Sequence, residues 1–168
     1  MELFNTRRIT NIGVMALIYV VISLICSPFA YQDLQFRISE MFILLCLFNK
    51  DYIISFTLGC FIVNLWSPLG YIDVVFGTTA TLISAILIYR SRSRINMFLA
   101  SLIPVIINGL VVAGELTHVE HTVYWKNACM VALGEFACIS IAGVIVVNAL
   151  RKNKRAMKLI TAGLDIRQ

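Results

Sequence analysis

Long runs of apolar residues, separated by short polar breaks, constrain the fold of this chain more than any other feature of its sequence. Of its 168 residues, 60% are hydrophobic and only 14% are charged, whereas soluble domains are about 45–50% apolar. A helix needs about 20 mainly apolar residues to cross the hydrocarbon core of a bilayer. We therefore predict an all-α integral membrane protein with a single transmembrane domain, residues 1–168.

The apolar runs predict a bundle of about six transmembrane helices, at residues 9–26, 38–48, 52–66, 72–89, 97–114 and 123–150. The second and third runs are short for helices that face lipid, so we expect them to line the interior of the protein. A re-entrant hairpin is the alternative for this pair. Residues 151–168 are expected to form a basic cytoplasmic tail.

The distribution of lysine and arginine predicts the orientation. With the N-terminus in the cytoplasm, one side of the membrane carries Arg7, Arg8, Lys50, the three arginines of residues 90–94 and the basic tail. Only Arg37 and Lys126 lie elsewhere, as the positive-inside rule favours. We therefore expect both termini to be cytoplasmic. The basic residues form no folded basic face, so nucleic acid is not an expected partner.

Asn108 and Glu135 lie well inside predicted spans, and Glu115 lies at the outer rim of one. An ionisable group at bilayer depth costs roughly 2.5–3.5 kcal/mol. Glu135 lies near the middle of its span, ten residues after Trp125. Asn108 and Glu115 are seven residues apart, which places them on one face of a helix. We expect these three side chains to line a pocket open to the outside. Packing between helices and a solvated interfacial carboxylate are the alternatives.

A second group of polar residues lies at the predicted outer ends of helices. Arg37 and Glu40 have the i, i+3 spacing of an ion pair, and Asn64 and Asp73 flank the turn at Pro68. These four residues are further candidates for ligand contact. A structural clamp and a favourable charge at a helix N-terminus are the alternatives.

The connection before the last span contains His118, Glu120 and His121, close to Glu115 in the sequence. Their spacing matches no recognised metal pattern, so a solvated loop is expected rather than a metal site. Trp125 is interpreted either as an interfacial belt residue or as a platform on which a flat ligand stacks. No cofactor is predicted.

Four groups of residues together resemble the QueT family: 35–40, 64–70 with 72–73, 108–110 with 114–116, and 132–135. Members of that family are the substrate-binding S-components of energy-coupling factor (ECF) transporters for queuosine precursors. The resemblance implies an S-component-like six-helix bundle in a prokaryotic cell membrane that captures a deazaguanine base from outside. It also implies partners: a transmembrane coupling subunit and two ATPases, in keeping with the absence of a phosphate-binding loop from this sequence.

S-components often carry an Ala-xxx-Ala surface on the first helix for the coupling subunit. The nearest equivalents here are Gly13 and Leu17, with Ala16 adjacent. These residues are the expected interface with the coupling subunit, although they depart from the family pattern.

The predicted pocket suits the ligand class that the resemblance implies. A carboxylate can accept the adjacent N–H groups of a guanine-like edge, and Asn108 or Arg37 can donate to its carbonyl. A second carboxylate can stabilise an aminomethyl cation. We expect Glu135 and Glu115 to divide these roles, with Trp125 stacking on the base.

Two other kinds of function stay open at this point. The chain could be an S-component for another vitamin-like molecule, or an autonomous secondary transporter in which Glu135 carries a proton. A membrane enzyme using His118 or His121 lacks any supporting motif, so the protein is not expected to be an enzyme itself.

Overall fold

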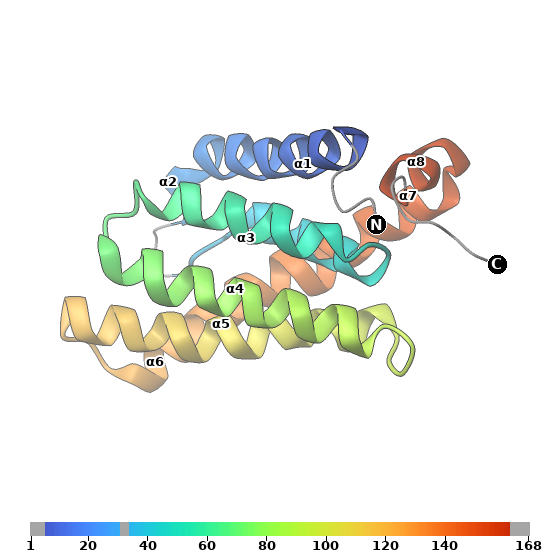
Figure 1. The fold of residues 1–168 in the computed structure, drawn as a ribbon. Helices are drawn as coiled ribbons and strands as arrows, with labels where there is room; N and C mark the ends of the chain where they lie inside the picture. Colours follow the sequence, from blue (N-terminus) through green and yellow to red (C-terminus); the bar gives the residue numbers. More distant parts are fainter. Residues whose placement is uncertain (1–5, 31–33, 162–168) are drawn as a thin grey trace.

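The computed structural model describes residues 6–30 and 34–161, and within them every regular element is a helix (Figure 1). In chain order these are α1 (Thr6–Ile25), α2 (Ser27–Ala30), η1 (Ile38–Leu47), α3 (Asp51–Asn64), α4 (Tyr71–Ser91), α5 (Met97–Glu120), α6 (Tyr124–Glu135), η2 (Phe136–Gly143), α7 (Val144–Lys152) and α8 (Lys154–Ile160). The prediction of an all-α membrane protein is confirmed. The number of spans needs correction.

Among the described residues, four helical segments are long and apolar enough to cross a membrane: Arg8–Ile25, Tyr71–Ser91, Met97–Glu120 and Tyr124–Lys152. The other two predicted spans correspond to η1 and α3, which are shorter apolar helices. The 10 residues of η1 form a 3₁₀ helix. At about 2.0 Å per residue it extends roughly 20 Å, about as far as the 14-residue α3 at 1.5 Å per residue.

The 3₁₀ helix η1 lies at the centre of the bundle. It contacts α1, α3, α4, α5, η2 and α7, and Ile43, Leu44, Leu45 and Cys46 on it are almost completely buried. A helix that is apolar on all sides is stable only when other helices cover it. The expectation that this short helix belongs to the interior is met.

The last predicted span is one continuous helical segment whose middle part is a π-helix. Its first part, α6, is followed by the π-helical η2 and then by α7. A π-helix winds more loosely than an α-helix and often occurs beside functional residues. Here it begins directly after Glu135.

The basic tail contains a helix that the hydropathy pattern did not predict. Asn153 caps α8 by accepting hydrogen bonds from the backbone N–H groups of Arg155 and Ala156. At the other end of α8, the buried backbone carbonyl of Ile160 accepts hydrogen bonds from Asn49 and Tyr52. The rest of the predicted tail, residues 162–168, lies outside the described residues.

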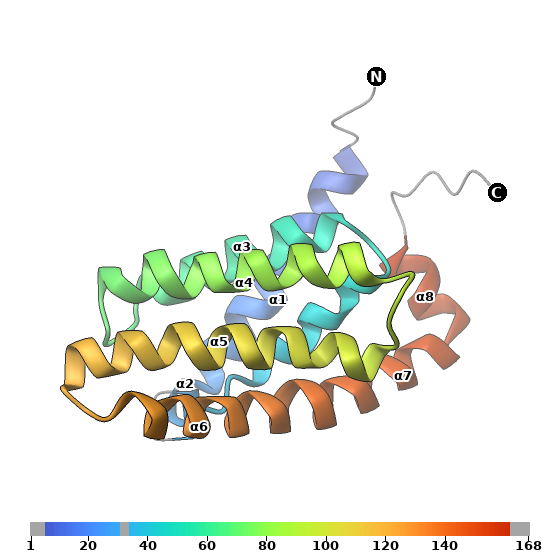
Figure 2. The same cartoon turned by 90° about the horizontal axis from the view of Figure 1, so that it is seen from below.

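The two ends of the bundle differ in charge. The start of α1, the α4–α5 turn and α8 lie at one end, whereas α2 and the α5–α6 connection lie at the other (Figures 1 and 2). The first of these ends, called here the basic end, carries Arg8, the arginines of residues 90–94 and the basic residues of α7 and α8. This distribution matches the predicted clustering of basic residues on one side.

Close approach of two backbones positions η1 in the bundle. A Cβ atom at Gly134 would collide with the backbone carbonyl oxygen of Leu34, so only glycine fits at this point of α6. The segment that leads into η1 can therefore lie directly against α6.

Replacing Gly134 with alanine tests this close approach. We expect Gly134→Ala to lower the free energy of unfolding by about 1–3 kcal/mol, because the backbone of residue 34 must move. In Gly13→Ala, the added Cβ meets no atom within 4 Å, so this control should be as stable as the original protein or more so. Thermal unfolding in detergent measures both, and equal midpoints would contradict the argument.

Candidate functional site

A group of polar side chains lies buried inside the apolar bundle, drawn from η1 and the residue before it, α3, α4, α5 and α6. We call it the polar cluster, and it consists of Arg37, Glu40, Asn64, Asp73, Asn108, Glu115 and Glu135. Glu40, Asn64, Asn108 and Glu135 are 0% exposed, and Glu115 is 4% exposed. Of the eight residues proposed from the sequence to contact ligand, six are therefore buried at this site, and a seventh, Arg37, has 11% of its side chain exposed.

Arg37 supplies the positive charge of the polar cluster. Its Nη2 atom donates a hydrogen bond to Oδ1 of Asn64 at 3.3 Å and lies 3.8 Å from Oδ1 of Asp73. The amide nitrogen of Asn64 in turn donates to the backbone carbonyl of Asp73 at 2.9 Å. Asn64 thus joins the end of α3 to the first turn of α4 and helps to orient the guanidinium. The i, i+3 ion pair predicted between Arg37 and Glu40 is not among the ion pairs of the described residues.

Glu40 is held by two hydroxyl groups that the sequence analysis did not identify. Its Oε1 atom accepts a hydrogen bond from the hydroxyl of Tyr19 at 2.6 Å and another from Thr81 at 3.3 Å. Both residues lie inside long apolar runs, where tyrosine and threonine are common packing residues, so the sequence carries no clear signal for them. Their hydroxyls fix this carboxylate between α1 and α4.

Asn108 and Glu135 meet between α5 and α6. The Nδ2 atom of Asn108 donates to Oε1 of Glu135 at 3.1 Å. The spacing in the sequence placed each residue on an interior face, but their direct contact depends on the close packing of the two helices. A Cβ at Gly109 would lie 3.2 Å from that of Ala132, so the neighbouring glycine allows this approach.

Gly77 makes room for the other half of the polar cluster. A side chain at this position would collide with the carboxylate of Asp73 and come within 3.0 Å of the Asn64 amide nitrogen. Gly77 follows Asp73 by four residues, one helical turn, and this spacing was the signal in the sequence that could have identified it.

Many polar atoms of the cluster have no hydrogen-bond partner. In the described part of the chain, nine buried side-chain nitrogen or oxygen atoms lack one, and seven of them belong to the polar cluster. These are Nη1 of Arg37, Oε2 of Glu40, Oδ1 of Asp73, Oδ1 of Asn108, both carboxylate oxygens of Glu115 and Oε2 of Glu135. Each buried unpaired group costs about 1–3 kcal/mol. Their concentration at one place indicates a site that a polar ligand completes.

The charges of the polar cluster are unequal. Glu115 interacts electrostatically with Asp73 and Arg37, and Glu135 interacts with Glu40 and Arg37. Four carboxyl groups thus share one guanidinium, so full ionisation would leave an excess of three negative charges. Like charges in a medium of low dielectric repel strongly. The arrangement therefore suits a ligand that carries a positive charge or donates several hydrogen bonds.

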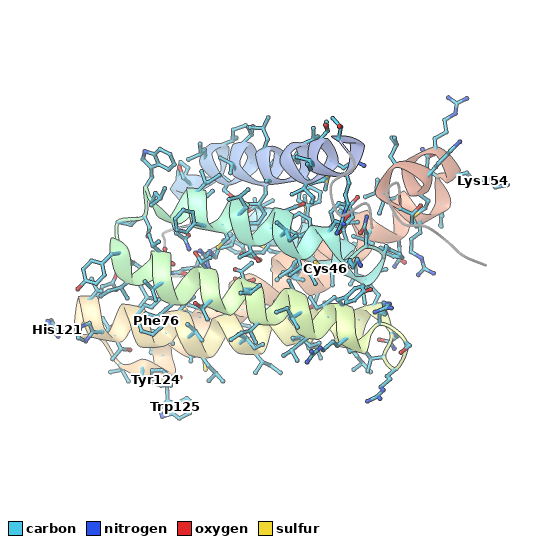
Figure 3. All side chains as sticks on the ribbon, viewed as in Figure 1. Cys46, Phe76, His121, Tyr124, Trp125 and Lys154 are labelled. Atoms are coloured by element: carbon cyan, nitrogen blue, oxygen red, sulfur yellow. The ribbon has the colours of Figure 1, made fainter. Side chains whose placement is uncertain are left out.

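Trp125 does not join the polar cluster. Its side chain is 70% exposed, its ring meets that of Tyr124 edge-on, and it points away from the bundle in Figure 3. Its location agrees with the interfacial-belt interpretation rather than with a stacking platform inside the pocket. A ring in this position does not face a ligand bound at the polar cluster.

His118 and Glu120, which were predicted to lie in a loop, belong to the end of α5, and His121 follows directly after it. His118, Glu120 and His121 are exposed, whereas Glu115 is buried. Among the described residues, no group of three or more histidine, cysteine, aspartate or glutamate side chains could hold a metal ion.

The three residues proposed for partner contact on α1 do not share one face. Gly13 and Leu17 are exposed, and a Cβ at Gly13 would meet no atom within 4 Å. Ala16 is only 4% exposed and faces the bundle, so it is not available to a partner. The accessible part of this surface consists of Gly13 and Leu17.

The sequence of the chain is similar to those of known transporters. The sequence profile described as "QueT transporter" matches residues 9–152 of the chain. A curated relative, the "Queuosine precursor transporter QueT" of Lactococcus lactis subsp. cremoris (strain MG1363), is 32% identical over 165 residues, covering 90% of this chain and 96% of the relative. No solved structure matches the chain.

Replacing Arg37 tests whether its charge holds the carboxyl groups together. We expect Arg37→Met to lower the free energy of unfolding by roughly 3–5 kcal/mol at neutral pH, because the carboxyl groups lose their buried counter-charge. Part of this loss should be recovered at lower pH, where protonation removes the repulsion. Arg94→Met, at an exposed position, is the control and should leave the unfolding midpoint unchanged. A loss for Arg37→Met that does not depend on pH would contradict the electrostatic explanation.

Proposed function

Because the chain belongs to the QueT transporter family, we propose that it captures a queuosine precursor, a 7-deazaguanine base, outside the cell for uptake. The observation that carries this proposal is the concentration of seven unpaired buried polar atoms in the polar cluster. A flat base with several donors and acceptors can satisfy such a set, whereas an apolar ligand cannot.

The unpaired atoms fit the recognition edge of a guanine-like base. Oε2 of Glu135 is free to accept from a ring or amino N–H group, since Oε1 already accepts from Asn108. Nη1 of Arg37 is free to donate to the carbonyl of the base. Because the amide nitrogen of Asn108 already donates to Glu135, we assign the contact with the carbonyl of the base to Arg37. Oδ1 of Asn108 has no partner, so we assign it to accept a hydrogen bond from an N–H group of the ligand.

The direction of capture follows from the charge of the two ends. We place the basic end in the cytoplasm, as the positive-inside rule requires, which puts both termini there. The end that carries α2 and the α5–α6 connection then faces the outside. Glu115, near the end of α5, lies closer to that surface than Glu135.

We further propose that the chain is the S-component of an ECF transporter. Its sequence contains no phosphate-binding loop, so the energy for uptake comes from a coupling subunit and two ATPases. The exposed surface of α1 at Gly13 and Leu17 is the proposed contact with the coupling subunit. A small residue such as Gly13 lets another helix approach closely in the membrane.

Binding of the base can be tested on the purified protein. Queuosine-precursor bases should raise the unfolding temperature, since a ligand at 100 times its Kd stabilises the folded state by about 2.7 kcal/mol. The absence of any shift with every deazaguanine base would overturn the proposed ligand class. Uptake that continues without the ATPases but stops with an uncoupler would instead favour the autonomous secondary transporter.

Replacing Glu135 tests its role in binding. We expect Glu135→Gln to weaken binding of the base roughly tenfold to a hundredfold, because a charge-assisted hydrogen bond contributes about 1.5–3 kcal/mol. Glu120→Gln removes an exposed carboxylate of the same helix pair and should leave the affinity unchanged. Isothermal titration calorimetry measures both variants. Similar affinities for the two would remove Glu135 from the proposed site.

Replacing Gly13 tests contact with the coupling subunit. Gly13→Leu should retain the affinity for the base but abolish uptake by cells that supply the ECF module, because the larger side chain prevents close helix approach. Val14→Leu, at the next exposed position of α1, is the matched control and should transport normally. Unimpaired uptake by Gly13→Leu would show that the coupling subunit docks elsewhere.

A further inference from the structure

A pocket of about 550 Å³ lies between α4 and α5, beside the polar cluster. We call it the side pocket. Its walls include Tyr71, Ile72 and Phe76 from α4 and Gly114, Glu115 and His118 from α5. Phe76 lies toward the end of the bundle that carries His121 and Tyr124 (Figure 3). The side pocket thus lies on the side of the bundle, near the end proposed to face outside. The buried carboxylate of Glu115 forms part of its wall.

Glu115 is the chemically distinctive wall of the side pocket. The residue is 4% exposed, and neither of its carboxylate oxygens has a hydrogen-bond partner. No other member of the polar cluster lines this pocket. The remaining walls are mostly apolar or aromatic. An anionic group among such walls is the usual complement of an organic ammonium, which an aromatic face also attracts.

Within the polar cluster, Glu115 is separated along α5 from the contact between Asn108 and Glu135. Glu115 lies seven residues, or roughly 10 Å of helix, from Asn108, which contacts Glu135. A base whose recognition edge meets Glu135 and Arg37 would therefore extend its opposite side toward Glu115. That side of a 7-deazaguanine carries the 7-substituent.

We propose that the side pocket is a subsite for a positively charged 7-substituent, whose amine is bound by Glu115 between the aromatic walls of α4. This inference rests on the proposed function and assigns the two carboxylates different tasks: Glu135 reads the base, and Glu115 reads the amine. The volume of the side pocket leaves room for a further group on the nitrogen. The protein should accordingly prefer the aminomethyl base and queuine to the nitrile base, which carries no charge.

The preference can be measured by calorimetry on the full chain in phosphatidylcholine nanodiscs. The original protein should bind the aminomethyl base roughly tenfold or more tightly than the nitrile base. Glu115→Gln should weaken amine binding and bring this ratio close to one. Both carboxylate oxygens lack partners, so the isosteric amide should fold, which the unfolding midpoint verifies. Glu120→Gln, an exposed carboxylate on the same helix, should preserve the ratio.

A second variant tests the volume of the side pocket rather than the charge of Glu115. A Cβ at Gly114 meets no atom within 4 Å, so Gly114→Leu extends into the side pocket without disturbing the packing. We expect it to weaken the binding of queuine, which has a ring on its amine, more than that of the aminomethyl base. Ile106→Phe enlarges an exposed side chain of α5 outside the pocket and should change neither affinity.

The outcomes separate this inference from the proposed function. If the bases bind but Glu115→Gln leaves the amine-to-nitrile ratio unchanged, the side-pocket assignment is wrong and the proposed function stands. If no base binds, the proposed function itself fails. A third outcome identifies a lipid: phosphatidylethanolamine in the nanodiscs would weaken amine binding to the original protein but not to Glu115→Gln. That result would assign Glu115 to a lipid headgroup and overturn its assignment to the substrate.

Discussion

A single guanidinium, that of Arg37, interacts with four carboxyl groups from four different helices, and the half of the bundle opposite the basic end is arranged around it. Asn64 holds the guanidinium through a hydrogen bond and Asp73 pairs with it, while Glu115 and Glu135 interact with it over a longer range. Charges are costly inside an apolar bundle unless they are paired or hydrogen-bonded. The position of η1, which Arg37 precedes, is therefore tied to the ends of α3 and α4 as well as to the interiors of α5 and α6.

This arrangement requires an unusual backbone at the centre of the bundle. A 3₁₀ helix extends further per residue than an α-helix, so ten residues of η1 span the distance between the polar cluster and the basic end. Glycines bring the neighbouring elements close: Gly134 accommodates the backbone before η1, and Gly77 accommodates the carboxylate of Asp73. The π-helical η2 begins directly after Glu135 and packs against η1. Irregular helices thus lie where the polar side chains must converge.

The sequence predicted those features that depend on polarity alone. Polar residues in apolar runs are stable only when they face one another or a ligand, which is why Asn108, Glu115 and Glu135 were predicted to face the interior, where they are buried. Glu40, Asn64 and Asp73 were expected at the outer ends of helices, but they are also buried. Hydropathy does not reveal helix type, so the sequence predicted helices at residues 38–48 and 123–150 but not the 3₁₀ type of η1 or the π type of η2. The short helix α8 was not predicted either. The direction of a single side chain was equally inaccessible for Trp125, which faces outward, and for Ala16, which faces inward. Both residues are apolar enough to be stable in either direction, so only the packing of the whole bundle determines it.

The two ends of the protein satisfy their polar groups in different ways. At the basic end, Arg8 forms two hydrogen bonds with Asp51, and Asn49 and Tyr52 both donate to the carbonyl of Ile160. These contacts join α1, α3 and α8 without any further molecule. At the opposite end, seven buried atoms of the polar cluster have no partner although they lie among groups of both charges. Folding alone does not explain why seven of the nine unpaired buried side-chain atoms of the described residues lie in this one cluster. Under the proposed function, a ligand that pairs with these atoms removes the cost of leaving them unpaired, and this gain contributes to its affinity.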